Sequence, residues 1–235
     1  MRAYWLIILL VFCCGGAKAQ LPKSIAVGYV ENFEKQPKIK FVKSSKAEYE
    51  QCEKSADPVK IKIKESKADF NLSTKSKTFK LKKTNNEEND FDGYEYIGYY
   101  KMLKMWAFTE NTMSDNLGFG TFALLDSLNG NYYNIVSIGD GAIETPIPSP
   151  NGKYLVYYYN RLYDGDSAFI GVLQVNRNLK AKQVLKETLS FDTESFAVEG
   201  IRWLNDKKFV VEAYNTVKKD GSRETIIQYL KANIQ

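Results

Sequence analysis

The sequence predicts an all-β protein built mainly of antiparallel strands, and three features of its 235 residues support this. Tyrosine and phenylalanine are abundant, with 16 and 13 copies, and aromatic side chains favour half-buried sheet surfaces. Turn pairs such as Asn129-Gly130 and Asn151-Gly152 recur at short intervals in the second half of the chain. Runs that alternate apolar and polar residues lie between such turns, as expected for strands with one buried face.

Residues 1–19 have the features of a secretory signal peptide. A positive charge precedes the short apolar run 4–12, and Ala17-Lys18-Ala19 places small residues where a signal peptidase cuts. We therefore expect cleavage before Gln20 and a secreted or periplasmic protein. The apolar run is shorter than the roughly 20 residues that span a bilayer, which disfavours a membrane anchor. Bulky residues ahead of Cys13 disfavour a lipoprotein, and no later segment is apolar for long enough to cross a membrane.

Residues 20–83 form a basic β region. Positions 35–83 contain 15 lysines against 6 acidic residues, whereas the rest of the chain is net acidic. The segments 58–64 (PVKIKIK) and 78–82 (TFKLK) alternate apolar residues with lysine, which predicts two strands. A third short strand is expected at 68–72, and the composition of 46–54 predicts a short polar helix.

The lysine faces of these strands are the clearest functional signal in the sequence. If the strands pair, their lysines form a basic ladder that concentrates anions. The predicted anion-binding residues are Lys60, Lys62, Lys64, Lys80 and Lys82. Expected partners are a protein or an anionic glycan or envelope component, and not nucleic acid, because the chain is exported. Two alternatives are protection of an edge strand by lysine and docking onto the acidic part of the same chain.

Residues 84–93 read as an acidic linker or loop. Glu88, Asp90 and Asp92 precede Gly93, which resembles the first half of a calcium-binding loop. Tyr99 occupies the place where an EF-hand has its bidentate glutamate, so the motif is incomplete. We expect no cofactor here, with calcium as the alternative. The single cysteine of the mature chain, Cys52, is expected to be solvated in a charged stretch.

Residues 94–235 contain a repeat of strand, tight turn and strand. Positions 147–160 and 201–214 align with a shift of 54, so that Asn151 meets Asn205 and Leu155 meets Phe209. A looser copy begins near Leu103. Repeats of this length with several strands each are typical of propeller blades.

The stretch SPNGKYLVYYYN, residues 149–160, resembles the SP-D-G-K-x-L-x-Y repeat of TolB-type, WD40-like β-propellers, and WLNDKKFVVEAYN resembles a diverged copy. Asn151 stands where that family usually has aspartate. The resemblance implies blade-like sheets, but it specifies no activity. A closed propeller typically needs at least four blades, so the repeats could form a partial or open stack, and a β-sandwich is the alternative.

The sequence contains no histidine, which removes the usual Ser-His-Asp and Cys-His catalysis and most zinc sites. Carboxylate chemistry remains, but the spacing pairs no two of the candidate acids. These are Glu144, Asp164, Asp166, Glu199 and Glu212.

The sequence therefore favours a non-catalytic binding or interaction protein of the cell envelope or extracellular space. One alternative is a glycan-active hydrolase that uses two carboxylates. Another is a subunit of an envelope assembly, which would expose unpaired strand edges when it is isolated.

Overall fold

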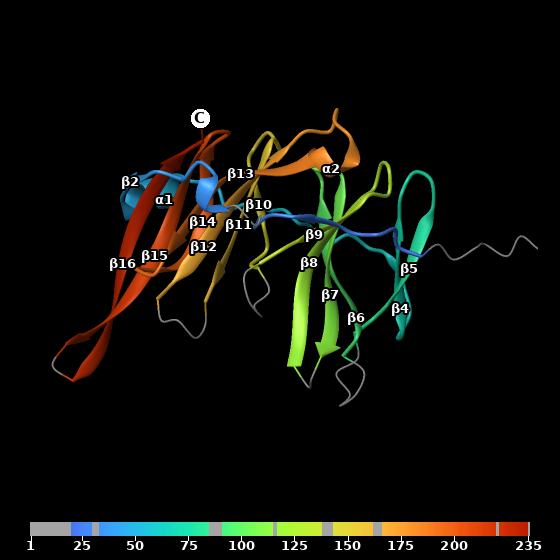
Figure 1. The fold of residues 1–235 in the computed structure, drawn as a ribbon, viewed down its shortest axis with the longest axis horizontal. Coiled ribbons are helices and arrows are strands. Elements are labelled where there is room, and N and C mark those ends of the chain that lie inside the picture. Colours follow the sequence, from blue (N-terminus) through green and yellow to red (C-terminus); the bar gives the residue numbers. More distant parts are fainter. Residues whose placement is uncertain are drawn as a thin grey trace, which may run out of the picture.

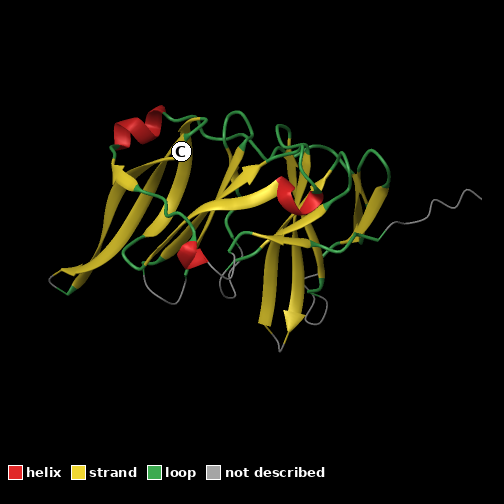
Figure 2. Ribbon diagram, turned by 45° about the horizontal axis from the view of Figure 1, so that its top comes forward, coloured by secondary structure: helices red, strands yellow, loops and turns green. Residues whose placement is uncertain are grey.

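The computed structural model describes residues 20–29, 33–84, 91–114, 117–137, 143–161, 166–219 and 221–234. Strands make up most of this part of the chain, and its helical segments are short (Figure 1; Figure 2). The strands form four sheets, and every pairing between named strands is antiparallel except that of β1 with β9. The predicted all-β, mainly antiparallel fold is thus confirmed. The predicted signal peptide lies outside the described residues.

Sheet A is the small sheet formed by the basic region, with the strand order β3-β4-β5. Its strands are β3 (Lys64–Glu65), β4 (Asp69–Ser73) and β5 (Thr78–Lys82). β5 coincides with the predicted strand 78–82, and β4 lies one residue beyond the predicted strand 68–72. The alternation has the expected effect, because Phe70, Leu72, Phe79 and Leu81 are all buried on one face.

The predicted strand 58–64 is wrong over most of its length. Only Lys64 belongs to a strand, and the chain before it follows the edge of β6 (Gly93–Tyr100) instead. Val59 exchanges backbone hydrogen bonds with Tyr99, and the Tyr96 hydroxyl lies 3.4 and 3.3 Å from the backbone nitrogen and oxygen of Ile61. One isolated backbone bridge and the contacts of the Tyr96 hydroxyl, both from β6, therefore replace the strand pairing that the alternation predicts.

Sheet B has the strand order β1-β9-β8-β7-β6. Besides β6, its strands are β1 (Ile25–Val27), β7 (Met105–Ser114), β8 (Leu117–Asp126) and β9 (Tyr132–Ile135). The predicted Asn129-Gly130 turn joins β8 to β9, and Gly130 has φ of 76°, which suits glycine.

Sheets C and D each begin with a hairpin of the predicted repeat. Sheet C contains β10 (Ile147–Pro148), β11 (Tyr154–Asn160), β12 (Ala168–Val175) and β13 (Leu185–Thr193), with helix α2 (Ala181–Val184) before β13. Sheet D contains β14 (Ala197–Asn205), β15 (Lys208–Lys219), β16 (Ser222–Asn233) and β2 (Phe41–Lys43), in that order.

The aligned segments 147–160 and 201–214 occupy corresponding places in these two sheets. In each, an asparagine side chain closes the turn: Asn151 Oδ1 accepts from the nitrogen of Lys153 at 2.9 Å, and Asn205 Oδ1 from that of Lys207 at 3.0 Å. The two turns also touch, because the nitrogen of Asn151 donates to Asp206 Oδ1. The assignment of these segments to propeller-type repeats stays a prediction.

The four sheets pack face to face in the row A, B, C, D (Figure 1). Separate apolar cores lie between A and B, between B and C, and between C and D. β11 shows the consequence, since Leu155 and Tyr157 face the core shared with sheet B while Val156 and Tyr158 face the core shared with sheet D. Within the described residues, sheet A does not meet sheet D, so the row is open.

The far face of sheet D is covered by helix α1 (Lys46–Gln51), close to the predicted helix 46–54. The Ser45 hydroxyl caps its first turn by accepting from the nitrogen of Glu48. Tyr49 and Cys52 pack against Val210 of β15. Cys52 is therefore buried, contrary to the expectation that it is solvated. A short 3-10 turn, Phe33–Lys35, precedes β2.

Strands from the first part of the chain also complete later sheets. β1 pairs with β9, and β2 pairs with β16. The basic region 20–83 thus shares sheets and cores with the region 94–235.

Candidate functional site

The five lysines predicted to form one ladder are divided between two surfaces. Lys64 lies opposite Asn71, and Asn71 lies opposite Lys80, so these lysines share the outer face of sheet A with Lys82. Lys80 forms an ion pair with Asp69 at 2.5 Å. Lys60 and Lys62 precede sheet A and lie at a groove along the edge of β6.

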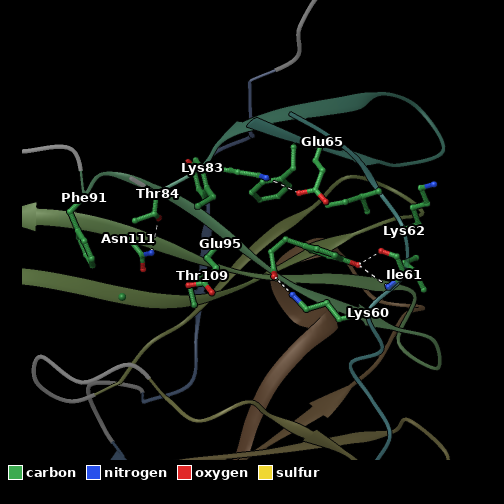
Figure 3. Close-up of a pocket in the computed structure, with 15 residues that line it drawn as sticks. Lys60, Ile61, Lys62, Glu65, Lys83, Thr84, Phe91, Glu95, Thr109 and Asn111 are labelled. Atoms are coloured by element: carbon green, nitrogen blue, oxygen red, sulfur yellow. Dashed lines mark hydrogen bonds and ion pairs between the residues drawn. The ribbon is translucent and has the colours of Figure 1, made fainter. Parts of the chain in front are cut away.

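This groove, which we call the β6-edge groove, has a volume of about 670 Å³. It lies between segment 60–65 and β6 (Figure 3). The Lys60 ammonium donates to the backbone oxygen of Tyr96 at 2.7 Å and lies 5.0 Å from the centre of the Tyr96 ring. Lys60 therefore satisfies an open carbonyl of the edge strand. The Lys62 side chain points away from the other labelled groups (Figure 3).

The rest of the β6-edge groove is also held by internal contacts. Lys83 pairs with Glu65 at 2.7 Å, and this hydrogen-bonded ammonium lowers the pKa of Glu65. Asn111 donates to the Thr84 hydroxyl at 2.8 Å, and the nitrogen of Thr84 bonds the backbone oxygen of Tyr94. Burial, with Glu110 nearby, raises the pKa of Tyr94 to about 12. The groove therefore contains both positive and negative side chains, and several of its polar groups already bond to other groups of the protein.

A second groove lies between sheets C and D and has a volume of about 710 Å³. Among the described residues, its lining contains four lysines and no acidic side chain. The lysines are Lys38, Lys40, Lys208 and Lys231. The lining also includes Gln174, Thr188, Asn233 and Tyr154, together with several apolar residues. We call this the inter-sheet groove.

Segment 37–43 positions two of these lysines by crossing from one sheet to the next. The nitrogen of Ile39 donates to the oxygen of Ser190 on β13 at 2.9 Å, and β2 then pairs with Leu230–Ala232 of β16. Ile39 is 4% exposed in the core between sheets C and D. Because alternate side chains of an extended chain point in opposite directions, Lys38 and Lys40 are exposed.

Lys231 has a counter-ion behind the inter-sheet groove. Its ammonium lies 2.6 Å from Glu48 Oε1, and Ser44 donates to the other oxygen of that carboxylate. The bonds from Lys231 and then Ser44 lower the pKa of Glu48, to which Lys208 also contributes. Lys38, Lys40 and Lys208 are exposed. Lys208 lies on the same face of β15 as Val210, which packs against helix α1, so Lys208 and Lys231 are on the α1 side of sheet D.

The sequence reasoning missed these residues. The run KIKF at 38–41 alternates lysine with an apolar residue, as PVKIKIK does, so that signal was present. Lys208 and Lys231 come from distant strands, and only their pairing in sheet D brings them to the groove.

The candidate carboxylates that the structure describes make different contacts in different places. Asp166 accepts from the nitrogen of Thr216, and Glu212 accepts from the Tyr229 hydroxyl at 2.8 Å. Glu144 and Glu199 are both near Tyr158 and contribute, after burial, to raising its pKa. Asp164 lies outside the described residues. None of the other four, all of which the structure describes, lines either groove.

Two residues of the calcium-like motif, Glu88 and Asp90, lie outside the described residues. Asp92 Oδ1 accepts from the nitrogen of Met113 at 2.7 Å. In the described part of the chain, no group of three or more Cys, Asp or Glu side chains is placed to hold a metal ion. No helix in that part is long and apolar enough to cross a membrane.

The chain was compared with protein-family models, with curated proteins and with solved structures, and none of the three comparisons found a match.

Proposed function

We propose that this protein is an exported, non-catalytic binding protein of the cell envelope or extracellular space, and that it holds an anionic glycan or another anionic envelope component in the inter-sheet groove. One observation carries the proposal: among the described residues, all the charged residues that line this groove are lysines. The signal-like residues 1–19 support export.

The physical basis is the summed potential of like charges on a concave surface. A cleft of one sign focuses the field, raises the local concentration of counter-charged ligand and speeds its association. Lysine suits repeated, loosely oriented anions because its ammonium is a compact charge with three donors on a flexible stem. Tyr154, which also lines the groove and is partly buried, supplies an aromatic side chain near these lysines.

Binding without cleavage fits the chemistry of this groove better than hydrolysis does. Glycoside hydrolysis uses two carboxyl groups that flank the scissile bond. Among the described residues, the groove lining has no carboxyl side chain. The proposal therefore concerns recognition alone.

The test compares labelled polysaccharides of equal length but different charge. We expect dextran sulfate and polygalacturonate to bind the purified protein, uncharged dextran not to bind, and the affinity to fall steeply as salt rises. Reducing-end analysis of the bound chains should show no new ends. Equal binding of charged and uncharged dextran, or cleavage of the charged chain, would contradict the proposal.

A further inference from the structure

β16 has one open edge. β15 pairs with it along its whole length, whereas β2 covers only Leu230–Ala232 on the other side. The nitrogen of Ser44 adds one bond to the oxygen of Tyr229. Among the described residues, no strand lies against residues 222–228 on this side. The β15–β16 hairpin also extends away from the body of the molecule (Figure 1).

The direction of the backbone groups along this edge follows from the contact at Tyr229. Its carbonyl points away from β15, toward Ser44, and the β15–β16 register has no irregularity. Since alternate residues of a strand share a direction, Arg223, Thr225 and Ile227 present their N–H and C=O groups to the open side. Such a row of unpaired groups is a template for another strand.

Apolar side chains accompany these backbone groups. Ile226 is 44% exposed and Ile227 is 57% exposed, and they point to opposite faces of the hairpin. Natural edge strands are commonly protected by charge, proline or a bulge. The described edge has neither a bulge nor a proline. Its charged residues within 222–228 are Arg223 and Glu224, which are of opposite sign, and Glu224 lies 3.9 Å from Lys219.

We propose that a second copy of this chain pairs with β16, edge to edge and antiparallel, with Thr225 opposite the partner's Thr225. Thr225 is the midpoint of the open stretch 222–228, so this register overlaps the whole stretch with itself. It uses all three outward-facing residues of each copy. Sheet D then continues across the two copies as one sheet.

The side chains agree with this register. Arg223 lies opposite the partner's Ile227, Glu224 lies opposite the partner's Ile226, and no like charges face each other directly. A register centred on Glu224 would place that carboxylate opposite the partner's Glu224. A register centred on Ile226 would require the carbonyl of Tyr229, which already accepts from Ser44. The edge is therefore complementary to itself in one register.

A single cysteine tests this register. Residues opposite each other in a hydrogen-bonded antiparallel pair have Cα atoms about 5.5 Å apart, which a disulfide can bridge. We expect Thr225→Cys to form a covalent dimer under mild oxidation. Lys218→Cys, on the neighbouring strand, is the matched control and should dimerise at least tenfold more slowly, as should the unmodified chain.

Light scattering of the unmodified protein gives the second measurement. We expect the mass to double with rising concentration, and Thr225→Pro to shift this doubling to at least tenfold higher concentration. Proline removes only an N–H that β15 does not use, whereas Thr225→Val keeps it and should still dimerise. A monomer at all concentrations, equal cross-linking of the two cysteine variants, or a cross-link to a different protein would overturn the proposal.

Discussion

The β6-edge groove and the inter-sheet groove have similar volumes, about 670 and 710 Å³, and both contain lysines. In the first, Lys60 and Lys83 bond to groups of the protein itself, and Glu65 and Glu95 lie among them. In the second, the charged residues of the lining are all lysines among the residues that the structure describes, and Glu48 of helix α1 pairs with Lys231. The number of lysines alone therefore does not identify a binding surface. The contacts that each ammonium already makes within the protein must also be considered.

The largest difference between the two grooves should be the loss of unfolding free energy when one apolar side chain beside each groove is shortened to alanine. Ile39→Ala removes a buried side chain between sheets C and D, which costs about 2–5 kcal/mol and loosens the segment that carries Lys38 and Lys40. Ile63→Ala, at the β6-edge groove, removes a half-buried side chain and should cost about 1 kcal/mol. Urea unfolding measures both values. Equal costs would mean that segment 37–43 is not anchored as described.

Neutralising lysines should next separate the grooves by affinity for anions. An exposed lysine–anion contact is worth about 1 kcal/mol, so Lys40→Gln with Lys208→Gln should weaken binding of dextran sulfate by about tenfold or more. The matched pair Lys60→Gln with Lys62→Gln changes the net charge equally and should weaken it by no more than about twofold. Fluorescence anisotropy at low salt measures both. A larger loss in the matched pair would move the site to the β6-edge groove.

The difference between the grooves also explains what could be predicted from the sequence. Strand β5 and the turns at Asn151 and Asn205 depend on local residues, and the sequence was sufficient for them. Segment 58–64 has the same alternation as β5, but contacts with Tyr96 and Tyr99 on β6 override it.

The inter-sheet groove depends on contacts that no local pattern encodes. Lys208 and Lys231 reach it because β15 and β16 pair, and Lys40 reaches it because β2 crosses to the edge of β16. The prediction that all five lysines form one ladder was wrong for the same reason. Lys60 bonds to the Tyr96 carbonyl on β6, more than thirty residues away in the sequence.

A smaller effect should distinguish a structural lysine from a functional one. Lys60→Met keeps the aliphatic stem but loses the bond to the Tyr96 carbonyl and the contact with its ring, so the free energy of unfolding should fall by about 1 kcal/mol. Lys40→Met should leave stability unchanged within about 0.5 kcal/mol. Thermal unfolding of the two variants measures this. Equal stability of both would show that the Lys60 contacts contribute nothing.

The smallest effect concerns the pKa values of Glu65 and Glu48, the two carboxylates that form ion pairs with lysines of the grooves. Hydrogen bonds from Lys83 lower the pKa of Glu65, and those from Lys231 lower the pKa of Glu48, both from an ordinary value of 4.5. A carboxyl group with a lower pKa in the folded state stabilises the fold above its unfolded-state value, and this contribution is lost as the pH falls through the folded-state value. NMR titration should show Glu65 returning toward 4.5 in Lys83→Met, with Glu48 unchanged, and the reverse in Lys231→Met. Ordinary pKa values for both groups in the unmodified protein would mean that neither ammonium is engaged. The β6-edge groove would then carry an uncompensated Lys83, and its contrast with the inter-sheet groove would largely disappear.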